Sequence, residues 1–360
     1  MRGVDVAIAI VTYRSANLTI DCLSSIEAER STPGVNIRAI VVDNASGDAK
    51  LVAKAIDKHG WWSWVTLITA PKNGGFAYGN NLALQRANAD GPPKYLHMLN
   101  PDTAVRKGAI GELVRFLEAH PDIGIAGSSF ENLDGSDWPK AFRFPSLLSE
   151  FEEGLQFGLA SRVLRRWVVP QVMTPVAQPI DWVVAASMMI RWSVFDRIGG
   201  FDDNYFLYFE ETDFCFRAKK VGLSTWYVPA SRVMHIGGQT TNVSNRKAVP
   251  ERLPGYWFES RRRYFVVNHG VAYAMIADVV ALLAHGLGSL KRTAQGRRHQ
   301  GVPHFFADLL RHSVLWPRNR LAASSIRPTR PLHQIPEGVV WPCNNDTYSS
   351  GHSTAIAGPH

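Results

Sequence analysis

The chain is poor in cysteine, and no pair of its cysteines has a spacing that could bind zinc or build a disulfide framework. Cys22, Cys215 and Cys343 are far apart in the 360 residues, which is typical of a protein in a reducing compartment. Internal repeats and long low-complexity tracts are also missing. No small-residue cleavage pattern follows the apolar run near the N-terminus, so we expect a first β-strand there rather than a secretory signal.

The usual glycine-rich nucleotide loops are absent as well. The stretch "NGGFAYGNN" at 73–81 fits neither GxGxxG nor a Walker loop, which argues against a dinucleotide-dependent enzyme and against an ATPase. A glycine turn before a predicted helix can still bring backbone N–H groups close to a phosphate. Phosphate binding is therefore a hypothesis for this turn.

Excess charge is missing from most of the chain and is concentrated near the C-terminal end. The net charge is +8; residues 286–330 contain nine Lys or Arg and one acid, and the rest of the chain is balanced. Such a segment suits phosphates or an anionic membrane face. The basic residues lack the interleaved aromatic residues of a known recognition module, so we expect no nucleic-acid partner.

The first half of the chain alternates between strand-like and helix-like segments. Apolar runs predict strands over 6–13, 37–46, 64–71, 95–102 and 123–130. Apolar residues at helical spacing predict helices over 15–29, 51–60, 74–88 and 107–121. This alternation predicts an α/β fold with a Rossmann-like, mostly parallel central sheet and helices on both faces.

Polar clusters follow the predicted strands, and parallel sheets bind ligands beyond the carboxyl ends of their strands. We expect these clusters to meet at one rim: Thr12-Tyr13, Asp43-Asn44, Asn73-Gly74-Gly75 and Asn100-Pro101-Asp102. Each cluster alone also fits an ordinary turn. Asp43 and Asn44 could bind a base or ribose, and Asp102 could offer a carboxylate oxygen to a hard cation.

The second half of the chain is less regular. Its prolines predict an irregular segment over 140–180, whereas 256–269 predicts a helix with basic and aromatic faces. Residues 271–290 are apolar and about as long as a membrane span, but Asp278 would be costly at mid-bilayer. We favour a helix that lies on a membrane surface or packs on the protein over a true span.

Three acids occur among five aromatic residues in "FLYFEETDFCFR" at 206–217. Asp213 and Arg217 are four apart, which suits a surface ion pair on a helix. A glutamate at 211 among aromatic side chains would have its pKa raised by desolvation, as a general base requires. His235 follows a predicted strand, and a single histidine of this kind is more often a packing residue than a metal ligand.

Taken together and in this order, six motifs resemble the family 2 glycosyltransferases with a GT-A fold, and especially their bacterial rhamnosyltransferase-like branch. They span about residues 5–242 and read "VTYRS", "VVDNASGD", "NGGFAYGNN", "LNPDT", "GGFDDNYFLYFEETDFCFRAKKVG" and "HIGGQTT".

The resemblance implies a role for each matched position. Asp102 and His235 would bind Mg²⁺ or Mn²⁺, although Asn100 stands where the family has the first acid of its DxD motif. Glu211 matches the catalytic base, with Glu where Asp is common. The implied nucleotide-binding residues are Thr12, Tyr13, Asp43, Asn44, Asn73, Gly75 and Asn100. Residues implied in acceptor contact or loop support are Trp182, Tyr208, Glu210 and Asp213.

The resemblance also implies the reaction: inverting transfer of a sugar from a nucleoside diphosphate sugar to a hydroxyl of a saccharide acceptor, in cell-envelope polysaccharide synthesis. The branch points to dTDP-rhamnose as donor. The basic segment fits a polyprenyl-diphosphate-linked acceptor at the cytoplasmic membrane surface. We expect a GT-A domain over 1–250, a helical, basic, membrane-associated extension over 251–325 and a poorly ordered tail over 326–360.

Two other functions share parts of this pattern. A sugar-phosphate nucleotidyltransferase would need a glycine-rich, basic signature after its first strand, and "VTYRSAN" lacks one. A catalytically inactive sugar-nucleotide-binding protein would not need Asp102, Glu211 and His235 together.

Overall fold

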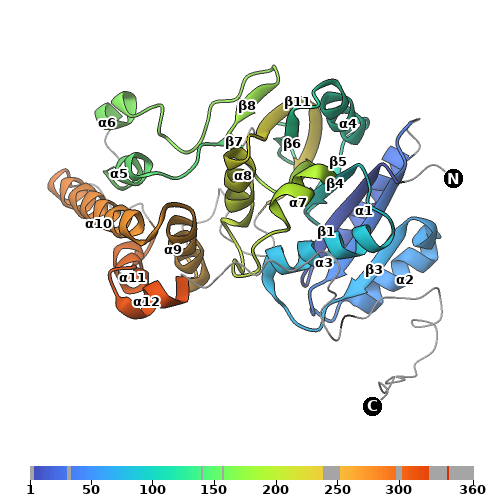
Figure 1. Cartoon of the computed structure of the whole chain (residues 1–360), viewed down its shortest axis with the longest axis horizontal. Coiled ribbons are helices and arrows are strands. Elements are labelled where there is room, and N and C mark those ends of the chain that lie inside the picture. Colours follow the sequence, from blue (N-terminus) through green and yellow to red (C-terminus); the bar gives the residue numbers. More distant parts are fainter. Residues whose placement is uncertain are drawn as a thin grey trace, which may run out of the picture.

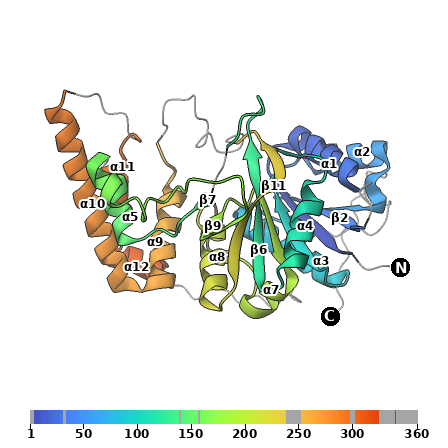
Figure 2. The ribbon, with the colours of Figure 1, turned by 90° about the horizontal axis from the view of Figure 1, so that it is seen from above.

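The computed structural model describes residues 4–30, 34–138, 141–155, 158–237, 252–296, 302–323 and 339. Its centre is a sheet of nine strands in the order β3-β2-β1-β4-β10-β6-β11-β5, with β8 paired to β11 beside this path. Helices cover the sheet, and a second group of helices lies next to it (Figures 1 and 2). The fold is mixed α/β, as the alternation of segments predicts.

One half of the sheet is parallel and was predictable from the apolar runs. It consists of β1 (Val6–Thr12), β2 (Ile37–Asp43), β3 (Val65–Thr69) and β4 (Tyr95–Leu99). All seven residues of β1 are buried, and alternate residues enter the two separate cores on the two faces. The predicted helices are present as α1 (Ala16–Arg30), α2 (Ala49–His59), α3 (Gly75–Ala89) and α4 (Ala109–Ala119).

The other half of the sheet is mixed. β10 (Ser187–Arg191) runs antiparallel between β4 and β6 (Ile123–Glu131), and β11 (Ser224–His235) is parallel to β6. β5 (Thr103–Val105) pairs antiparallel with β11, so that His235 lies opposite Thr103. This pairing brings two motifs to the same edge, although Thr103 and His235 are 132 positions apart. Also in this half are α7 (Trp192–Ile198) and α8 (Glu210–Lys220).

The predicted irregular segment over 140–180 is wrong in part. It contains β7 (Ala141–Phe142), α5 (Leu147–Leu155), α6 (Gly158–Val163) and β8 (Gln178–Ile180), with β9 (Trp182–Val183) just after. Its prolines did not prevent order because they lie outside helix interiors: Pro145 precedes α5, and Pro179 lies in the short strand β8.

The second group of helices, here called the helical half, contains α5, α6, α9 (Gly255–His269), α10 (Val271–Ala294), α11 (Phe305–His312) and α12 (Pro317–Ala323). The predicted helix over 256–269 is present as α9, but its predicted basic face is wrong. Arg261, Arg262 and Arg263 are all buried. Arg261 pairs with Glu150 and Asp278 at 2.7 and 2.6 Å, which offsets the cost of burying its charge.

Among the described residues, α10 is the single helix long and apolar enough to cross a membrane. Its inner face packs on α5 through small residues, and Asp278 on that face also accepts hydrogen bonds from the Ser313 hydroxyl and the Val314 N–H. The helix therefore packs on the protein along one side, as one of the two favoured alternatives predicts. The expected boundary near residue 250 and the tail over 326–360, apart from residue 339, lie outside the described residues.

Candidate active site

The strand ends of β1 and β2 meet at one rim, where amide side chains connect the turns. The Asn44 N–H donates to the Thr12 carbonyl at 2.9 Å, and the Asn44 side-chain amide donates to Asn73 Oδ1 at 2.9 Å and to the Gly75 carbonyl at 3.0 Å. Asp43 accepts hydrogen bonds from Ser46, while its other oxygen, Oδ2, is buried and has no partner among the described residues. The structure thus brings these predicted residues together and leaves one carboxylate oxygen available for a ligand.

Two other predicted rim residues differ in what they offer. The Thr12 hydroxyl is fully buried and is already bonded to Ser15 and Thr19, each at 2.9 Å, so this side chain supports the rim from behind. Tyr13 is half-buried and is contacted by the guanidinium of Arg14. Of the two, the Tyr13 ring is the one that reaches the surface.

The glycine turn does not form the predicted phosphate cradle. The N–H groups of Gly74 and Gly75 donate to Asn44 Oδ1 and Asn73 Oδ1, and the Phe76 N–H donates to the Phe206 carbonyl at 2.8 Å. All three donors therefore already have protein acceptors. Glycine is required at 75 for another reason: φ is +88°, and a Cβ would come within 2.1 Å of the Phe206 carbonyl oxygen.

Asp102 and His235 are in contact. His235 Nε2 is 3.3 Å from Asp102 Oδ1, and the Gly237 N–H donates to Asp102 Oδ2 at 3.1 Å. The His235 ring lies against Trp138 and Phe130. Both polar side chains are more than nine-tenths buried. Their contact is fixed by the β5–β11 pairing, which places His235 opposite Thr103, the residue after Asp102.

These residues fit a divalent cation whose other ligands come from the substrate. Within the described ranges, no three His, Cys, Asp or Glu side chains form a metal-binding group. Mg²⁺ is commonly bound by one or two carboxylates together with substrate phosphates and water. Asn100 Oδ1 and His235 Nδ1 are buried polar atoms that have no partner in the described part of the chain. Asp102 is also buried, follows Asn100 by two residues and contacts the His235 ring through its carboxylate.

Glu210 and Glu211 begin α8, after two residues in left-handed backbone conformation, Tyr208 (φ 71°) and Phe209 (φ 67°). Burial raises the pKa of Glu211 to about 7, although N–H groups of Glu211, Ala185 and Thr212 bond its carboxylate and act in the opposite direction. Burial and then the charge of Glu211 raise the pKa of Glu210 well above its ordinary value. Two adjacent carboxyls with raised pKa values suit proton transfer near neutral pH.

The short segment Ala185–Ala186 connects this carboxylate to the cation-binding candidates. The Ala185 N–H bonds Glu211, and the Ala186 carbonyl accepts the Asn100 N–H at 3.1 Å. Asn100 is two residues before Asp102. The structure therefore gathers the predicted residues from both motifs around one strand connection at the end of β4.

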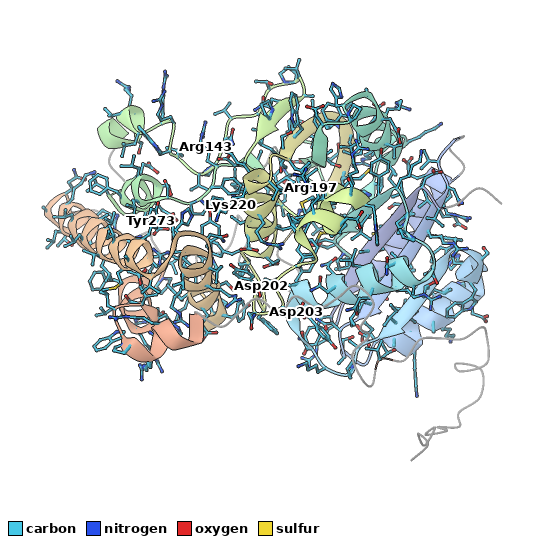
Figure 3. All side chains as sticks on the ribbon, viewed as in Figure 1. Arg143, Arg197, Asp202, Asp203, Lys220 and Tyr273 are labelled. Atoms are coloured by element: carbon cyan, nitrogen blue, oxygen red, sulfur yellow. The ribbon has the colours of Figure 1, made fainter. Side chains whose placement is uncertain are left out.

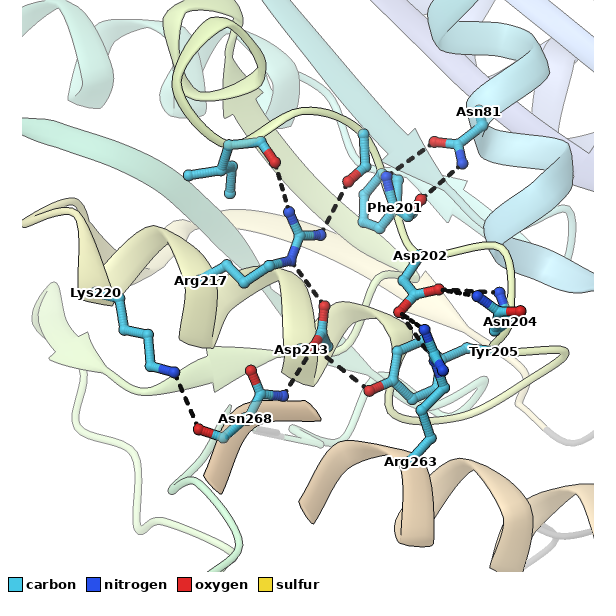
Figure 4. A network of polar contacts seen from close by, with 12 residues as sticks. Asn81, Phe201, Asp202, Asn204, Tyr205, Asp213, Arg217, Lys220, Arg263 and Asn268 are labelled. Carbon is cyan, nitrogen blue, oxygen red and sulfur yellow. Dashed lines mark hydrogen bonds and ion pairs between the residues drawn. The ribbon is translucent and has the colours of Figure 1, made fainter. Parts of the chain in front are cut away.

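Asp213 does pair with Arg217, at 2.8 Å, but the prediction of a surface pair is wrong (Figure 4). The Asp213 side chain is fully buried and also accepts hydrogen bonds from Asn268 at 2.8 Å and from the Tyr205 hydroxyl at 3.4 Å. Arg217 donates further to the Ile198 and Gly200 carbonyls. Asp213 is thus a buried residue that stabilises the fold next to Glu210 and Glu211.

The aromatic residues near the acids do not all face outward. Phe209 packs against Trp257 and Tyr264 of α9, whereas Phe206 and Tyr208 lie beside the Tyr256 ring. Phe209 is therefore a packing residue between the base-bearing helix α8 and α9, and only Phe206 and Tyr208 remain for contact with an acceptor.

Trp182, a further residue expected in acceptor contact or loop support, stacks on Phe142 at 4.3 Å and donates its indole N–H to the Arg143 carbonyl. This position fixes the β7–β9 pair, so Trp182 serves loop support here.

The sequence reasoning missed residues that fix the backbone before the acids. Asn81 of α3 bonds both the N–H and the carbonyl of Phe201, at 2.9 and 2.8 Å. From α9, Arg263 pairs with Asp202, and Ser260 donates to the Leu207 carbonyl. Asn81 lies within the motif at 73–81 and could have been noticed there. Nothing in the sequence pairs Ser260 and Arg263 with residues 53 and 61 positions earlier.

Comparisons with known proteins point to the glycosyltransferases. Residues 7–167 match the family model described as Glycosyl transferase family 2. The chain is 26% identical over 245 residues to an N-acetylglucosaminyl-diphospho-decaprenol L-rhamnosyltransferase of Mycobacterium tuberculosis, covering 65% of this chain and 76% of that protein. It is 23% identical over 281 residues to the dTDP-rhamnosyl transferase RfbF of Shigella flexneri, covering 77% of this chain and 85% of that protein.

A solved structure supports the fold. GalNAc-T7, solved with UDP, GalNAc and Mn²⁺, superimposes with a TM-score of 0.55 at 15% sequence identity, covering 82% of this chain and 55% of that chain. The fold of this chain is therefore of the GT-A type, with additional C-terminal helices.

Proposed function

We propose that the chain, whose residues 7–167 match the family 2 glycosyltransferase model, transfers a sugar from a nucleoside diphosphate sugar to a hydroxyl of a saccharide acceptor by a single inverting displacement. One observation carries the proposal: the segment Ala185–Ala186 contacts both motifs, because the Ala185 N–H lowers the pKa of the buried Glu211 carboxyl and the Ala186 carbonyl accepts the Asn100 N–H at 3.1 Å. A base and a diphosphate-binding group at one site are what such a displacement needs.

The donor side of the proposal uses the rim. Asp43 Oδ2, buried and without a partner among the described residues, is an acceptor for a base N–H or a ribose hydroxyl. Tyr13 offers a ring face at the surface of the same rim. Asn44 and Asn73 bond each other and the glycine turn, so their contribution is to keep this rim in one shape.

Asp102 and His235, with Asn100 beside them, would bind Mg²⁺ or Mn²⁺. When bound, the cation neutralises charge on the departing nucleoside diphosphate. Asp102 is itself oriented by the Gly237 N–H, and His235 is fixed by the Trp138 ring, so both ligands are positioned before the donor arrives.

Glu211 performs the proton transfer. Its carboxylate takes the proton of an acceptor hydroxyl while that oxygen attacks the anomeric carbon from the face opposite the diphosphate. The new carbon–oxygen bond forms as the bond to the diphosphate oxygen breaks, and the anomeric configuration inverts. Phe206, Tyr208 and Tyr256 line this side and limit the access of water, whose attack on the donor would compete.

The acceptor is proposed to be lipid-linked, because the outer face of α10 is apolar and exposed. The outward side chains of this helix are between 41 and 69% exposed: Ile276, Val279, Leu283, Leu287 and Leu290. Lys291 and Arg292 follow them directly, and Phe306 of α11 lies against Gly286. An apolar stripe next to basic residues suits a helix lying in the surface of an anionic membrane.

The reaction is tested by incubating the purified protein and Mn²⁺ with a panel of nucleotide sugars that includes dTDP-rhamnose, with and without a polyprenyl-diphosphate-linked N-acetylglucosamine. We expect release of nucleoside diphosphate from one donor and transfer of its sugar with inverted anomeric configuration. Absence of release from every donor, together with tight binding of one, would favour an inactive sugar-nucleotide-binding protein.

The membrane contact is tested by sedimentation with vesicles containing anionic phospholipid. Changing Leu283 and Leu287 together to Glu is expected to weaken binding at least about tenfold, because two apolar side chains are lost and two negative charges are added. The matched control is Leu51→Glu on α2, which changes an equally exposed leucine in the sheet half. Equal vesicle binding by the double variant and the wild type would show that α10 does not contact the membrane.

A further inference from the structure

The backbone before the two glutamates is held in an unfavourable conformation. Tyr208 and Phe209 both have positive φ although neither is a glycine. Such a conformation persists only where surrounding contacts determine the backbone. The contacts around residues 202–209, here called the base loop, therefore decide where Glu211 points.

Side chains of helix α9 donate hydrogen bonds to the base loop and to α8. The Ser260 hydroxyl donates to the Leu207 carbonyl at 3.0 Å. Figure 4 shows two further contacts: Arg263 donates through Nε and Nη2 to Asp202 Oδ2 at 2.9 and 2.7 Å, and Asn268 donates to Asp213 at 2.8 Å. Ser260 and Arg263 are three residues apart and therefore lie on the same side of the helix. The Arg263 and Asp202 side chains are at most 4% exposed.

Aromatic packing adds to the same contact. The Phe209 ring lies 5.8 Å from Trp257 and 5.7 Å from Tyr264, both on α9. The Arg263 guanidinium also lies over the ring of Tyr205, at 5.7 Å. The strained residue directly before Glu210 is thus enclosed by the helix.

Helix α3, which packs on the sheet, also contacts the base loop. The Phe76 N–H donates to the Phe206 carbonyl, and Asn81 bonds Phe201, the residue directly before the loop. Figure 3 shows Asp202 and Asp203 between the helices that cover the sheet and the helical half. The base loop is therefore fixed between the donor rim and α9.

We propose that Arg263 is a positioning residue for the transfer reaction: with Asp202 it fixes the base loop so that the Glu211 carboxylate faces the acceptor hydroxyl. The role of Glu211 in this inference rests on the proposed function. The contact between Arg263 and Asp202 is observed in the structure and does not depend on that function. The simpler alternative is that the ion pair only stabilises the fold.

Arg261 provides a matched control on the same helix. It is as buried as Arg263 and pairs with Glu150 and Asp278, but these partners belong to α5 and α10 rather than to the base loop. Lysine at either position keeps the positive charge and loses the planar group that donates two hydrogen bonds. Comparing Arg263→Lys with Arg261→Lys therefore separates loop position from general stability.

The experiment compares the two variants in steady-state kinetics with dTDP-rhamnose and the lipid-linked acceptor, and in hydrogen–deuterium exchange of residues 202–211. For Arg263→Lys we expect kcat to fall about ten- to a hundredfold, the donor KM to change less than twofold, and exchange of the loop to rise. For Arg261→Lys we expect kcat within about threefold of wild type and unchanged loop exchange.

A double variant, Asp202→Asn with Arg263→Met, removes both charges and guards against simple unfolding. It is expected to recover thermal stability relative to Arg263→Met alone, because no unpaired charge remains buried, while kcat stays low. Recovery of kcat together with stability would overturn the proposal, as would equal kcat losses in the two lysine variants.

Failure of the proposed function gives a different result. If the wild type transfers no sugar from dTDP-rhamnose, the donor is wrong, and the exchange comparison still decides whether Arg263 fixes the base loop. Unchanged loop exchange in Arg263→Lys would refute the contact's positioning role whatever the donor.

Discussion

The donor rim and the base loop carry similar polar side chains but are fixed by different parts of the chain. At the rim, Asn44 and Asn73 bond each other across neighbouring strand ends. The base loop is fixed by α9, whose Arg263 reaches back 61 positions to Asp202. The rim is thus a product of local strand order, whereas the geometry of the acids depends on the helical half.

This difference separates two kinds of failure. A change at the rim should alter donor or cation binding and leave the acids in place. A change at the base loop, or at the helices behind it, should alter the rate of transfer and leave donor binding intact. The following variants test this separation.

The largest effect is expected at the base itself. Glu211→Gln removes the proton acceptor and should lower kcat by about 10²–10⁴-fold, with the donor dissociation constant within twofold of wild type. Rates are measured by nucleoside diphosphate release and donor binding by calorimetry. The control is Glu210→Gln, which changes the buried neighbour and should lower kcat less than tenfold. Retention of a tenth of the rate in Glu211→Gln would assign the base elsewhere.

A change at the rim edge should act on the cation instead. Asp102→Asn removes the carboxylate beside His235, and the Mn²⁺ concentration needed for half-maximal rate should rise about ten- to a hundredfold. The exposed Asp122 offers a control, and Asp122→Asn should leave the Mn²⁺ requirement unchanged. An unchanged requirement in Asp102→Asn would show that the cation, if used, is bound by other groups.

The rate should also depend on pH in a way set by the base loop. Burial raises the pKa of Glu211 to about 7, so the carboxyl is mostly protonated at pH 6 and mostly ionised at pH 8. Because the ionised form takes the proton, kcat/KM should be about tenfold higher at pH 8 than at pH 6. Melting temperatures over the same range serve as the control for unfolding. If kcat/KM instead rises around pH 4.5, the ordinary pKa of glutamate, the result would contradict the burial of this carboxyl.

The smallest effect is expected where the rim touches the base loop. Gly60 and Gly75 both have positive φ, but only at 75 would a Cβ meet another group, the Phe206 carbonyl. Gly60→Ala should lower the free energy of unfolding by about 1–2 kcal/mol from backbone strain alone. Gly75→Ala should cost about 1–3 kcal/mol more because the carbonyl must move. Equal losses in urea unfolding would mean that the loop yields freely at this contact.

The sequence predicted the parallel half of the fold and the meeting of the rim residues, because both depend on local patterns. Apolar runs of strand length identify β1 to β4, and their shared direction places Thr12, Asp43 and Asn44 at one end. The contact of Asp102 with His235 was expected from the motifs, and the β5–β11 pairing explains it.

Other features could not be predicted, because they depend on partners far along the chain. A run of three arginines in a helix normally indicates an exposed basic face, yet here Glu150, Asp202 and Asp278 compensate the buried charges of Arg261 and Arg263. Asp213 was expected at the surface for a similar reason. The pairing with Arg217 was correct, but Asn268, 55 positions later, encloses it.

The glycine turn shows how a motif can be recognised while its chemistry is misread. Its glycines suggested room for a phosphate, and the room is taken by the Phe206 carbonyl. Sequence alone does not reveal which backbone approaches a glycine.

The buried ion pair between Asp202 and Arg263 has a practical consequence for building hybrid enzymes. If the C-terminal helices of this protein were exchanged for those of a relative with a different acceptor preference, the buried side chains of Asp202 and Asp213 would meet other residues in place of Arg263 and Asn268. A functional chimera should therefore import residues 200–217 together with 252–323 as one cassette, although the two segments are separated in the gene.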